Sequence, residues 1–305
     1  MAPLPDVIEV GRFLRDPTRP LKARFRALFV LRNLNGEKAV TEIVQCFNDA
    51  SALLKHELAY CLGQMQHPAA VAPLTAVLSD VSREPIFRHE AGEALAAIND
   101  RSAIECLSRC QSDRTPEVAE TCQLALQRLQ FFSDPSNEAE RERLSVNPYR
   151  SVDPTPPFTV DREKNVAELR AILLDKQATL WDRYRAMFSL RNLGTDSAVQ
   201  ALSEALHCPR SALFRHEVAY VLGQMQNDRA TESLVQRLAD STENSMVRHE
   251  CAEALGAIAT ERCTAALQSF LNDESRIVRE SCEVALDMCD YEQSGLLQYA
   301  SVQCS

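Results

Sequence analysis

The chain contains two copies of one long unit. The stretch LLKHELAYCLGQMQ at 53–66 returns as LFRHEVAYVLGQMQ at 213–226, with four differences in fourteen positions. Three further stretches return at nearly the same offset, for example RHEAGEALAAI at 88–98 as RHECAEALGAI at 248–258. A sequence that repeats over about half of its length is restricted to folds whose halves are built alike.

Each copy also repeats internally every 31 to 33 residues. The first copy contains four units, marked by LRNL at 31–34, LGQM at 62–65, LAAI at 95–98 and LQRL at 126–129. This period, with helical periodicity and turn residues between the helices, is typical of stacked helical hairpins. We therefore expect an all-α fold of eight HEAT-type hairpins, in two pseudo-symmetric four-repeat halves that form an α-solenoid clamp.

The stretch from 131 to 160 interrupts this pattern. It is rich in proline, serine and charge and has no sustained apolar period, which predicts a linker. We expect an N-terminal HEAT half at 1–132, a linker at 133–160 and a C-terminal HEAT half at 161–305. Such a linker would let the two halves face each other, and a clamp complete in itself predicts a monomer.

The composition argues against several classes of protein. The formal net charge of −10 argues against a nucleic-acid binder and suits a cationic partner. No stretch reaches the apolar length of a membrane span, no secretory signal pattern opens the chain, and no CxxC occurs among the 11 cysteines. We expect reduced thiols in a cytoplasmic protein.

One dipeptide stands out from the repeats. Four of the six histidines are followed directly by glutamate: His56-Glu57, His89-Glu90, His216-Glu217 and His249-Glu250. Each pair lies six residues before the first leucine of its unit's marker segment, near the start of the second helix of its hairpin. A polar helix face, with glutamate favoured near the helix N-terminus, accounts for one such pair but not for four at symmetric positions.

The outer repeats of each half do not contain the dipeptide. Their corresponding residues are Phe25-Arg26, Glu120-Thr121, Tyr184-Arg185 and Glu280-Ser281. The fold therefore does not need His-Glu in order to form, and the pairs indicate function.

The helical period places these histidines away from the hairpin core. At about 100° per residue, His56 lies opposite the apolar stripe of Leu58 and Leu62 and shares its face with Ala59 and Gly63. We expect these small residues to let another group approach closely. Stacking of adjacent repeats predicts His56 beside His89 on one wall, and His216 beside His249 on the other.

Imidazole and carboxylate ligands without thiolate suit iron, manganese or zinc, and iron is favoured where positions stay open for dioxygen. A structural zinc would more often recruit cysteine. The duplication predicts two metal ions. Di-iron carboxylate proteins of the four-helix-bundle class place Glu-x-x-His on one helix, so His-Glu on stacked repeats would be a separate solution. Two ferrous ions can reduce dioxygen together and hydroxylate a C–H bond when two further electrons are supplied.

The motifs KHELAY, RHEAGEAL, FRHEVAY and RHECAEAL, on eight HEAT-type repeats, resemble those of deoxyhypusine hydroxylases over nearly the whole chain. That family hydroxylates the deoxyhypusine side chain of eukaryotic translation initiation factor 5A to hypusine, with a non-haem di-iron centre. The resemblance implies two Fe²⁺ ions per chain, dioxygen as co-substrate, an external two-electron donor and this factor as protein partner, with no nucleic acid and no membrane. The ligands that it implies are His56, His89, Glu90, His216, His249 and Glu250.

Four other glutamates have less defined expected roles. Glu57 and Glu217 are expected to bind metal or to hold the cationic amine of the substrate. Glu93 and Glu253 share the histidine face one turn further on. They are candidates for orienting the imidazoles, or they are solvated carboxylates.

Three rival interpretations remain from the residues alone. A non-catalytic HEAT scaffold would bind a protein partner without stoichiometric metal. A dinuclear metallohydrolase would act without dioxygen, and the basic residues before each histidine (Lys55, Arg88, Arg215 and Arg248) leave room for phosphate binding. The related repeats of phycobilin lyases share the hairpin but give no reason for four His-Glu pairs.

Overall fold

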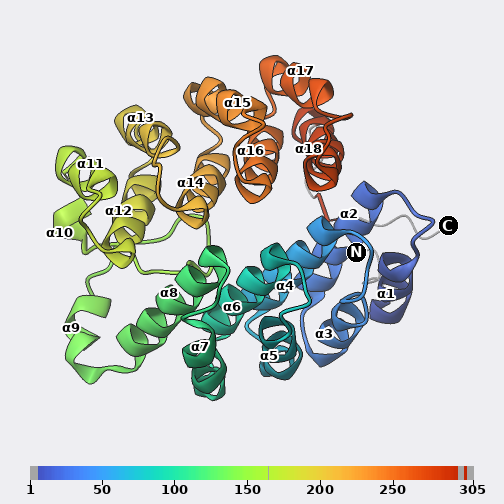
Figure 1. Cartoon of the computed structure of the whole chain (residues 1–305), viewed down its shortest axis with the longest axis horizontal. Helices are drawn as coiled ribbons and strands as arrows, with labels where there is room; N and C mark the ends of the chain where they lie inside the picture. The colour runs from blue at the N-terminus through green and yellow to red at the C-terminus, as the bar shows by residue number, and fades with distance from the viewer. Residues whose placement is uncertain (1–5, 164, 295–298, 301–305) are drawn as a thin grey trace, which may run out of the picture. The chain divides into compact units, whose positions relative to one another are not determined.

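The computed structural model describes residues 6–163, 165–294 and 299–300, and its regular structure is helical (Figure 1). Eighteen α-helices occur in this part of the chain, and sixteen of them follow one another as eight hairpins. The only pairing of extended backbone within the same ranges is one bridge between Leu144 and Thr159. The predicted all-α fold of eight HEAT-type hairpins is confirmed.

In the first four hairpins the partners are α1 (Val7–Arg15) with α2 (Leu21–Leu34), α3 (Glu37–Val44) with α4 (Ala52–Met65), α5 (Val71–Ser79) with α6 (Pro85–Ile98), and α7 (Ile104–Cys110) with α8 (Pro116–Ser133). In the last four they are α11 (Val166–Leu174) with α12 (Leu180–Leu193), α13 (Asp196–Ala205) with α14 (Ala212–Met225), α15 (Thr231–Ala239) with α16 (Ser245–Ile258), and α17 (Glu261–Ser269) with α18 (Arg276–Ser294). The short helices α9 (Glu138–Arg141) and α10 (Val160–Glu163) lie between these sets, and four 3₁₀ turns are η1 (Pro68–Ala70), η2 (Arg101–Ala103), η3 (Pro135–Asn137) and η4 (Asp228–Ala230).

The contacts divide the chain into two compact units. Unit 1 contains residues 1–125 together with 294–305, and unit 2 contains residues 126–293. The division falls inside α8, so the segment between α8 and α11 belongs to unit 2. The last residues of the chain belong to unit 1, although they follow the last helix of unit 2.

Local signals explain where the second helix of a hairpin begins and ends. The hydroxyls of Ser51 and Ser211 cap α4 and α14 by accepting the backbone N–H groups of Leu54 and Phe214, at 3.0 and 2.9 Å. Helices α4, α6, α14 and α16 each end in a left-handed residue: Gln66, Asn99, Gln226 and Ala259. The repeat therefore contains the start and stop signals of its own helix.

Buried arginines join each hairpin to the next. In three hairpins, the Nε of an arginine donates to a carbonyl oxygen ten residues earlier, and its guanidinium pairs with an aspartate 25 residues later: Arg24 with Leu14 and Asp49, Arg88 with Leu78 and Asp113, and Arg248 with Leu238 and Asp273. Arg88 Nη2 lies 2.6 Å from Asp113 Oδ2. These pairs fix the spacing between successive repeats, because a buried guanidinium is costly without its carboxylate.

One of these pairs differs between the two copies. Cys208 occupies the place that Asp49 has in unit 1, and Arg183 Nη2 donates to its sulfur at 3.1 Å. Although burial opposes it, hydrogen bonds from the Arg210 backbone and the Arg183 side chain lower the pKa of the Cys208 thiol. The arginine is thus retained even where its partner is a thiol.

Asp113→Ala should reduce the free energy of unfolding by about 3 kcal/mol, because it leaves the Arg88 guanidinium buried without its carboxylate. The control is Glu105→Ala, which breaks an exposed pair with Arg109 and should cost less than about 1 kcal/mol. Urea denaturation measures both. Equal losses in the two variants would contradict the structural role of the buried pair.

The same pairs predict how stability depends on pH. Hydrogen bonds from Arg88 and Arg248 hold the pKa values of Asp113 and Asp273 below the ordinary 3.8. A carboxyl with a lowered native pKa stabilises the fold fully above its unfolded pKa, and this contribution is lost as pH falls through the native value. We expect the urea concentration at the midpoint of denaturation to decrease as the pH is lowered past about 4. In the Asp113→Asn/Asp273→Asn variant this decrease should be smaller than in the unchanged chain.

Candidate metal centre

A close approach of two helices builds the site in unit 1. A Cβ on Gly63 of α4 would lie 2.8 Å from the Cα of Ala94 of α6, so only glycine allows these backbones to pack as they do. In unit 2, a Cβ on Gly223 of α14 would lie 2.9 Å from the Cα of Ala254 of α16. The His-Glu helices are therefore held side by side in each unit by the same pair of small residues.

In unit 1 this packing brings three of the expected ligands together. The rings of His56 and His89 lie 5.5 Å apart between centroids. Glu90 Oε2 is 3.2 Å from His56 Nε2 and 4.0 Å from His89 Nε2. All three residues are buried, with His89 fully inaccessible, and a ligand atom from each lies within 4.8 Å of the others.

Unit 2 repeats this arrangement. The rings of His216 and His249 lie 5.3 Å apart, and Glu250 Oε2 is 3.2 Å from His216 Nε2. Here His249 turns its Nδ1 toward Glu253 Oε1 at 3.4 Å. His249, Glu250 and Glu253 offer ligand atoms within 4.8 Å of one another. A carboxylate on Nδ1 fixes the tautomer that leaves Nε2 available to a metal.

These groups fit a metal ion. An ion that binds nitrogen and oxygen ligands at about 2.1 Å accommodates ligand atoms up to about 4.2 Å apart, and the His56–Glu90, His89–Glu90 and His216–Glu250 distances lie within this limit. Buried carboxylates also need a positive charge nearby for compensation. The donor set is imidazole and carboxylate, which suits iron, manganese or zinc.

Thiolate is not among the donors. Burial raises the pKa of the Cys61 thiol well above its usual value, and the nearby Glu57 carboxylate raises it further. Burial likewise raises the pKa of Cys251, next to Glu250. Both thiols stay protonated at neutral pH, and the ten cysteines that the structure describes are all free.

Comparison with known proteins identifies the family of this chain. The sequence profile of HEAT repeats matches residues 40–127, 166–244 and 211–287. Deoxyhypusine hydroxylase of Gallus gallus is 55% identical over 299 residues, covering 98% of this chain and 97% of that protein, and the Homo sapiens protein of that name is 55% identical over 97% of this chain and 95% of its own. The chain belongs to the deoxyhypusine hydroxylase family. The solved structure of human deoxyhypusine hydroxylase in complex with glycerol is also similar, with a TM-score of 0.88, 56% identity, and coverage of 93% of this chain and 96% of that one.

The remaining expected site residues lie on the same helices. Glu57 and Glu217 are buried, at 6% and 3% exposure, which suits functional carboxylates better than solvated ones. Glu253 contacts the His249 imidazole, and both Glu253 and its counterpart Glu93 are half-buried.

The small residues of the histidine face do permit a close approach. At Gly63 the group that approaches is the neighbouring helix, at Ala94. Gly92 likewise faces Thr121 of α8, 3.3 Å from the position of an added Cβ. In a stacked repeat the second helix of each hairpin has neighbours on both sides, so the face opposite its own partner helix is also packed.

The basic residues that precede the histidines have structural partners. Arg88 and Arg248 join successive hairpins, as described above. Lys55 pairs with Glu84 at 2.5 Å and Arg215 with Glu243 at 2.6 Å. All four cations are therefore engaged by carboxylates of the same unit.

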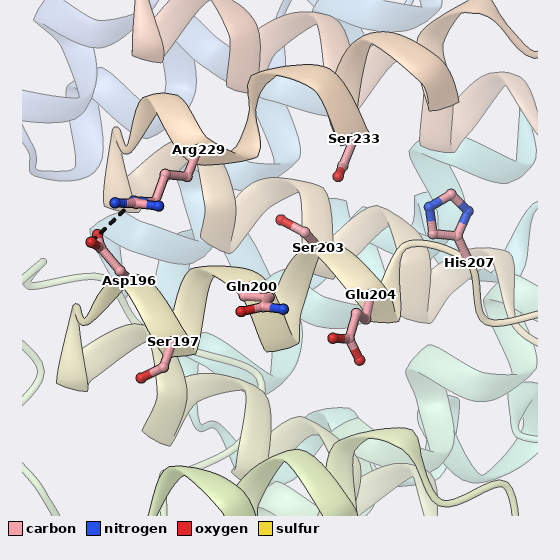
Figure 2. A pocket seen from close by; sticks show the side chains of 8 residues that line it. All are labelled: Asp196, Ser197, Gln200, Ser203, Glu204, His207, Arg229 and Ser233. Carbon is pink, nitrogen blue, oxygen red and sulfur yellow. Dashed lines mark ion pairs between the residues drawn. The ribbon is translucent and has the colours of Figure 1, made fainter.

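The two histidines outside the motif are placed elsewhere. His67 caps η1 by accepting the Ala69 backbone N–H at 3.2 Å. His207 lines a polar pocket of about 470 Å³ between α13 and α15, together with residues such as Glu204 and Arg229 (Figure 2). None of the residues lining this pocket lies on α14 or α16, the His-Glu helices of unit 2. No helix in the described ranges is long and apolar enough to cross a membrane.

Gly63→Ala should separate α4 from α6, because its Cβ would clash with backbone atoms. We expect the free energy of unfolding to fall by about 1–3 kcal/mol and ferrous iron to bind more weakly, as followed by anaerobic titration. The control is Gly92→Ala, whose nearest contact is a side-chain methyl that can shift. If Gly63→Ala bound iron as tightly as Gly92→Ala does, the close approach would not be what positions the ligands.

Proposed function

We propose that this protein hydroxylates the deoxyhypusine side chain of eukaryotic translation initiation factor 5A, in the cytoplasm and as a monomer, to form hypusine. Two observations support this proposal together. The chain is 55% identical to curated deoxyhypusine hydroxylases over nearly its full length, and each unit contains two neighbouring histidines with a carboxylate 3.2 Å from one of them.

We propose that the ligands of two iron ions are His56, His89, Glu90, His216, His249 and Glu250. These residues would hold two ferrous ions, which would supply the chemistry of dioxygen activation. An external donor would supply the two electrons of the overall reaction, in which one oxygen atom is inserted into a C–H bond of the substrate and the other takes up two protons to leave as water. Glu253 fits the role of a positioning residue that holds the proton on His249 Nδ1.

Glu57 and Glu217 are the proposed partners of the cationic substrate amine. Their burial would make each carboxylate a strong acceptor for an ammonium group, because a charged hydrogen bond strengthens away from water. The acidic net charge of the chain, −10, suits approach of a positively charged side chain.

The two rival functions have less support. A metallohydrolase needs cations for its anionic substrate, and the four basic residues beside the histidines are already paired with carboxylates. A non-catalytic scaffold has no reason to bury four imidazoles and four carboxylates, since burial of polar groups is costly without compensation.

His89→Ala should lose iron and hydroxylation together, because it removes a buried ligand. The purified chain should contain two irons and incorporate isotopically labelled oxygen from dioxygen, not from water, into a deoxyhypusine-containing protein. His67→Ala is the matched control: it removes a histidine outside the cluster and should keep both properties. A chain that stays active without dioxygen would be a hydrolase, and a folded chain that never binds iron would be a scaffold.

Glu57→Gln should keep its iron but raise KM for the protein substrate by about 10–100-fold, the loss of one charge-assisted hydrogen bond. Glu217→Gln tests the same carboxylate in unit 2. Iron content and steady-state kinetics distinguish the roles, since loss of iron in either variant would assign that carboxylate to the metal instead.

A further inference from the structure

A polar and aromatic segment is bound to α12 in unit 2. We call residues 149–158 the linker strap. Asp153 pairs with both terminal nitrogens of the fully buried Arg191, at 2.7 and 2.9 Å. Ser151 Oγ accepts from Arg191 at 3.3 Å and from Gln224 at 3.2 Å, and the Arg191 guanidinium stacks on the Tyr149 ring at 5.0 Å.

The strap also covers the rest of that helix face. Arg185 donates to the carbonyl oxygens of Pro156 and Pro157 at 3.3 and 3.0 Å, and it stacks on the Phe158 ring at 4.5 Å. The face that the strap covers consists of Arg185, Phe188 and Arg191, spaced three residues apart and each at most 7% exposed.

The end of the chain repeats the start of this strap. Tyr149-Arg150-Ser151-Val152 follows the last helix of the first copy, and Tyr299-Ala300-Ser301-Val302 follows the last helix of the second. The residue after Val152 is Asp153, whereas the residue after Val302 is Gln303. The duplicated unit thus includes the residues that come after its fourth hairpin, apart from the two charges of Arg150 and Asp153, which Ala300 and Gln303 replace.

The helix face that would receive such a segment also exists in unit 1. Arg26, Phe29 and Arg32 of α2 correspond to Arg185, Phe188 and Arg191 of α12. Arg32 stacks on Phe29 at 5.0 Å, as Arg191 stacks on Phe188 at 4.7 Å. These three residues of α2 are half-buried, whereas their counterparts are buried.

Tyr299 lies on this face. Its ring centroid is 4.9 Å from the Arg26 guanidinium carbon and 5.9 Å from the Phe29 ring, with an interplanar angle of 70°. Edge-to-face aromatic pairs and arginine–aromatic stacking are both attractive. Residues from Ser294 onward accordingly group with unit 1.

We propose that Tyr299 anchors a second strap, with its ring docked on Arg26 and Phe29 of α2 as the linker strap is docked on α12. The first strap shows what docking contributes to the unit. Gln224, which bonds to Ser151, also bonds to the Tyr220 hydroxyl at 2.9 Å, and both residues lie on α14, one and two turns beyond His216. The corresponding residues on α4 are Tyr60 and Gln64, one and two turns beyond His56. The strap therefore stabilises the first helical pair of unit 1 and supports the helix that contains His56.

Native-state hydrogen exchange of α2 tests the proposal with point variants. Tyr299→Ala should reduce the protection of α2 amides by about tenfold, whereas Tyr299→Phe, which keeps the ring, should reduce it much less. The amides of α12 should not change in either variant. Asp153→Ala in the linker strap should show the reverse pattern, loss in α12 and none in α2. Unchanged α2 protection in Tyr299→Ala would overturn the proposal.

A chain that ends at Gln293 provides the second test. Its α2 amides should be less protected, and a synthetic peptide of residues 294–305 added in excess should restore them, since a ligand stabilises the state that it binds. The same peptide with Tyr299→Ala should fail. Equal rescue by both peptides, or no loss on truncation, would overturn the proposal. If the truncated chain does not fold, the Tyr299 variants decide the matter.

These measurements are independent of the proposed hydroxylase function. Exchange protection of α2 is read without iron, substrate or dioxygen. If the Tyr299 variants change α2 protection in a chain that binds no iron, the strap stands and the proposed function fails. If the chain binds iron and hydroxylates but α2 protection does not change, only the strap proposal fails.

Discussion

The contact on which the site depends is the packing of one His-Glu helix against the next. Gly63 against Ala94, and Gly223 against Ala254, bring two backbones so close that a single added carbon would clash. The imidazole rings of neighbouring helices then lie side by side, with centroids 5.5 and 5.3 Å apart. The ion pairs Lys55–Glu84 and Arg215–Glu243 join the same helices near their N-terminal ends. The distances between the proposed metal ligands therefore follow from the spacing of the repeats.

Most of the fold could be predicted from the sequence because it repeats, and the same repetition selected the residues of the proposed site. The period gave the hairpins, and the placement of His-Glu in the middle repeats alone marked His56, His89, His216 and His249. The sequence pattern could not predict the roles of residues that depend on contacts between repeats. Nothing in the helical period shows that Arg88 reaches an aspartate 25 residues away or that Gly63 faces Ala94. Nor does it show that Glu253 Oε1 lies against His249 Nδ1.

Differences between the copies show which parts of the repeat are constrained. Arg183 of unit 2 pairs with Cys208, where Arg24 of unit 1 pairs with Asp49. Gln303 likewise corresponds to Asp153, although the tyrosine four residues earlier is present in both segments. The four His-Glu pairs do not differ at all. Connections between hairpins tolerate exchange of a carboxylate for a weaker acceptor, because the guanidinium still has a carbonyl oxygen to bind, for example that of Leu173 for Arg183. A metal ligand has no such substitute.

The order of the two straps along the chain has a consequence for synthesis on the ribosome. The linker strap is made before α12, so unit 2 can fold onto a segment that is already present. The fourth hairpin ends with α8 at Ser133, but Tyr299, which anchors the strap of unit 1, is made much later. At roughly 5–20 residues per second, the intervening chain takes roughly 8–33 s to appear. During that interval the arginine–aromatic face of α2 is uncovered on the nascent protein. A chaperone therefore has more time to bind the first half of this chain than the second half.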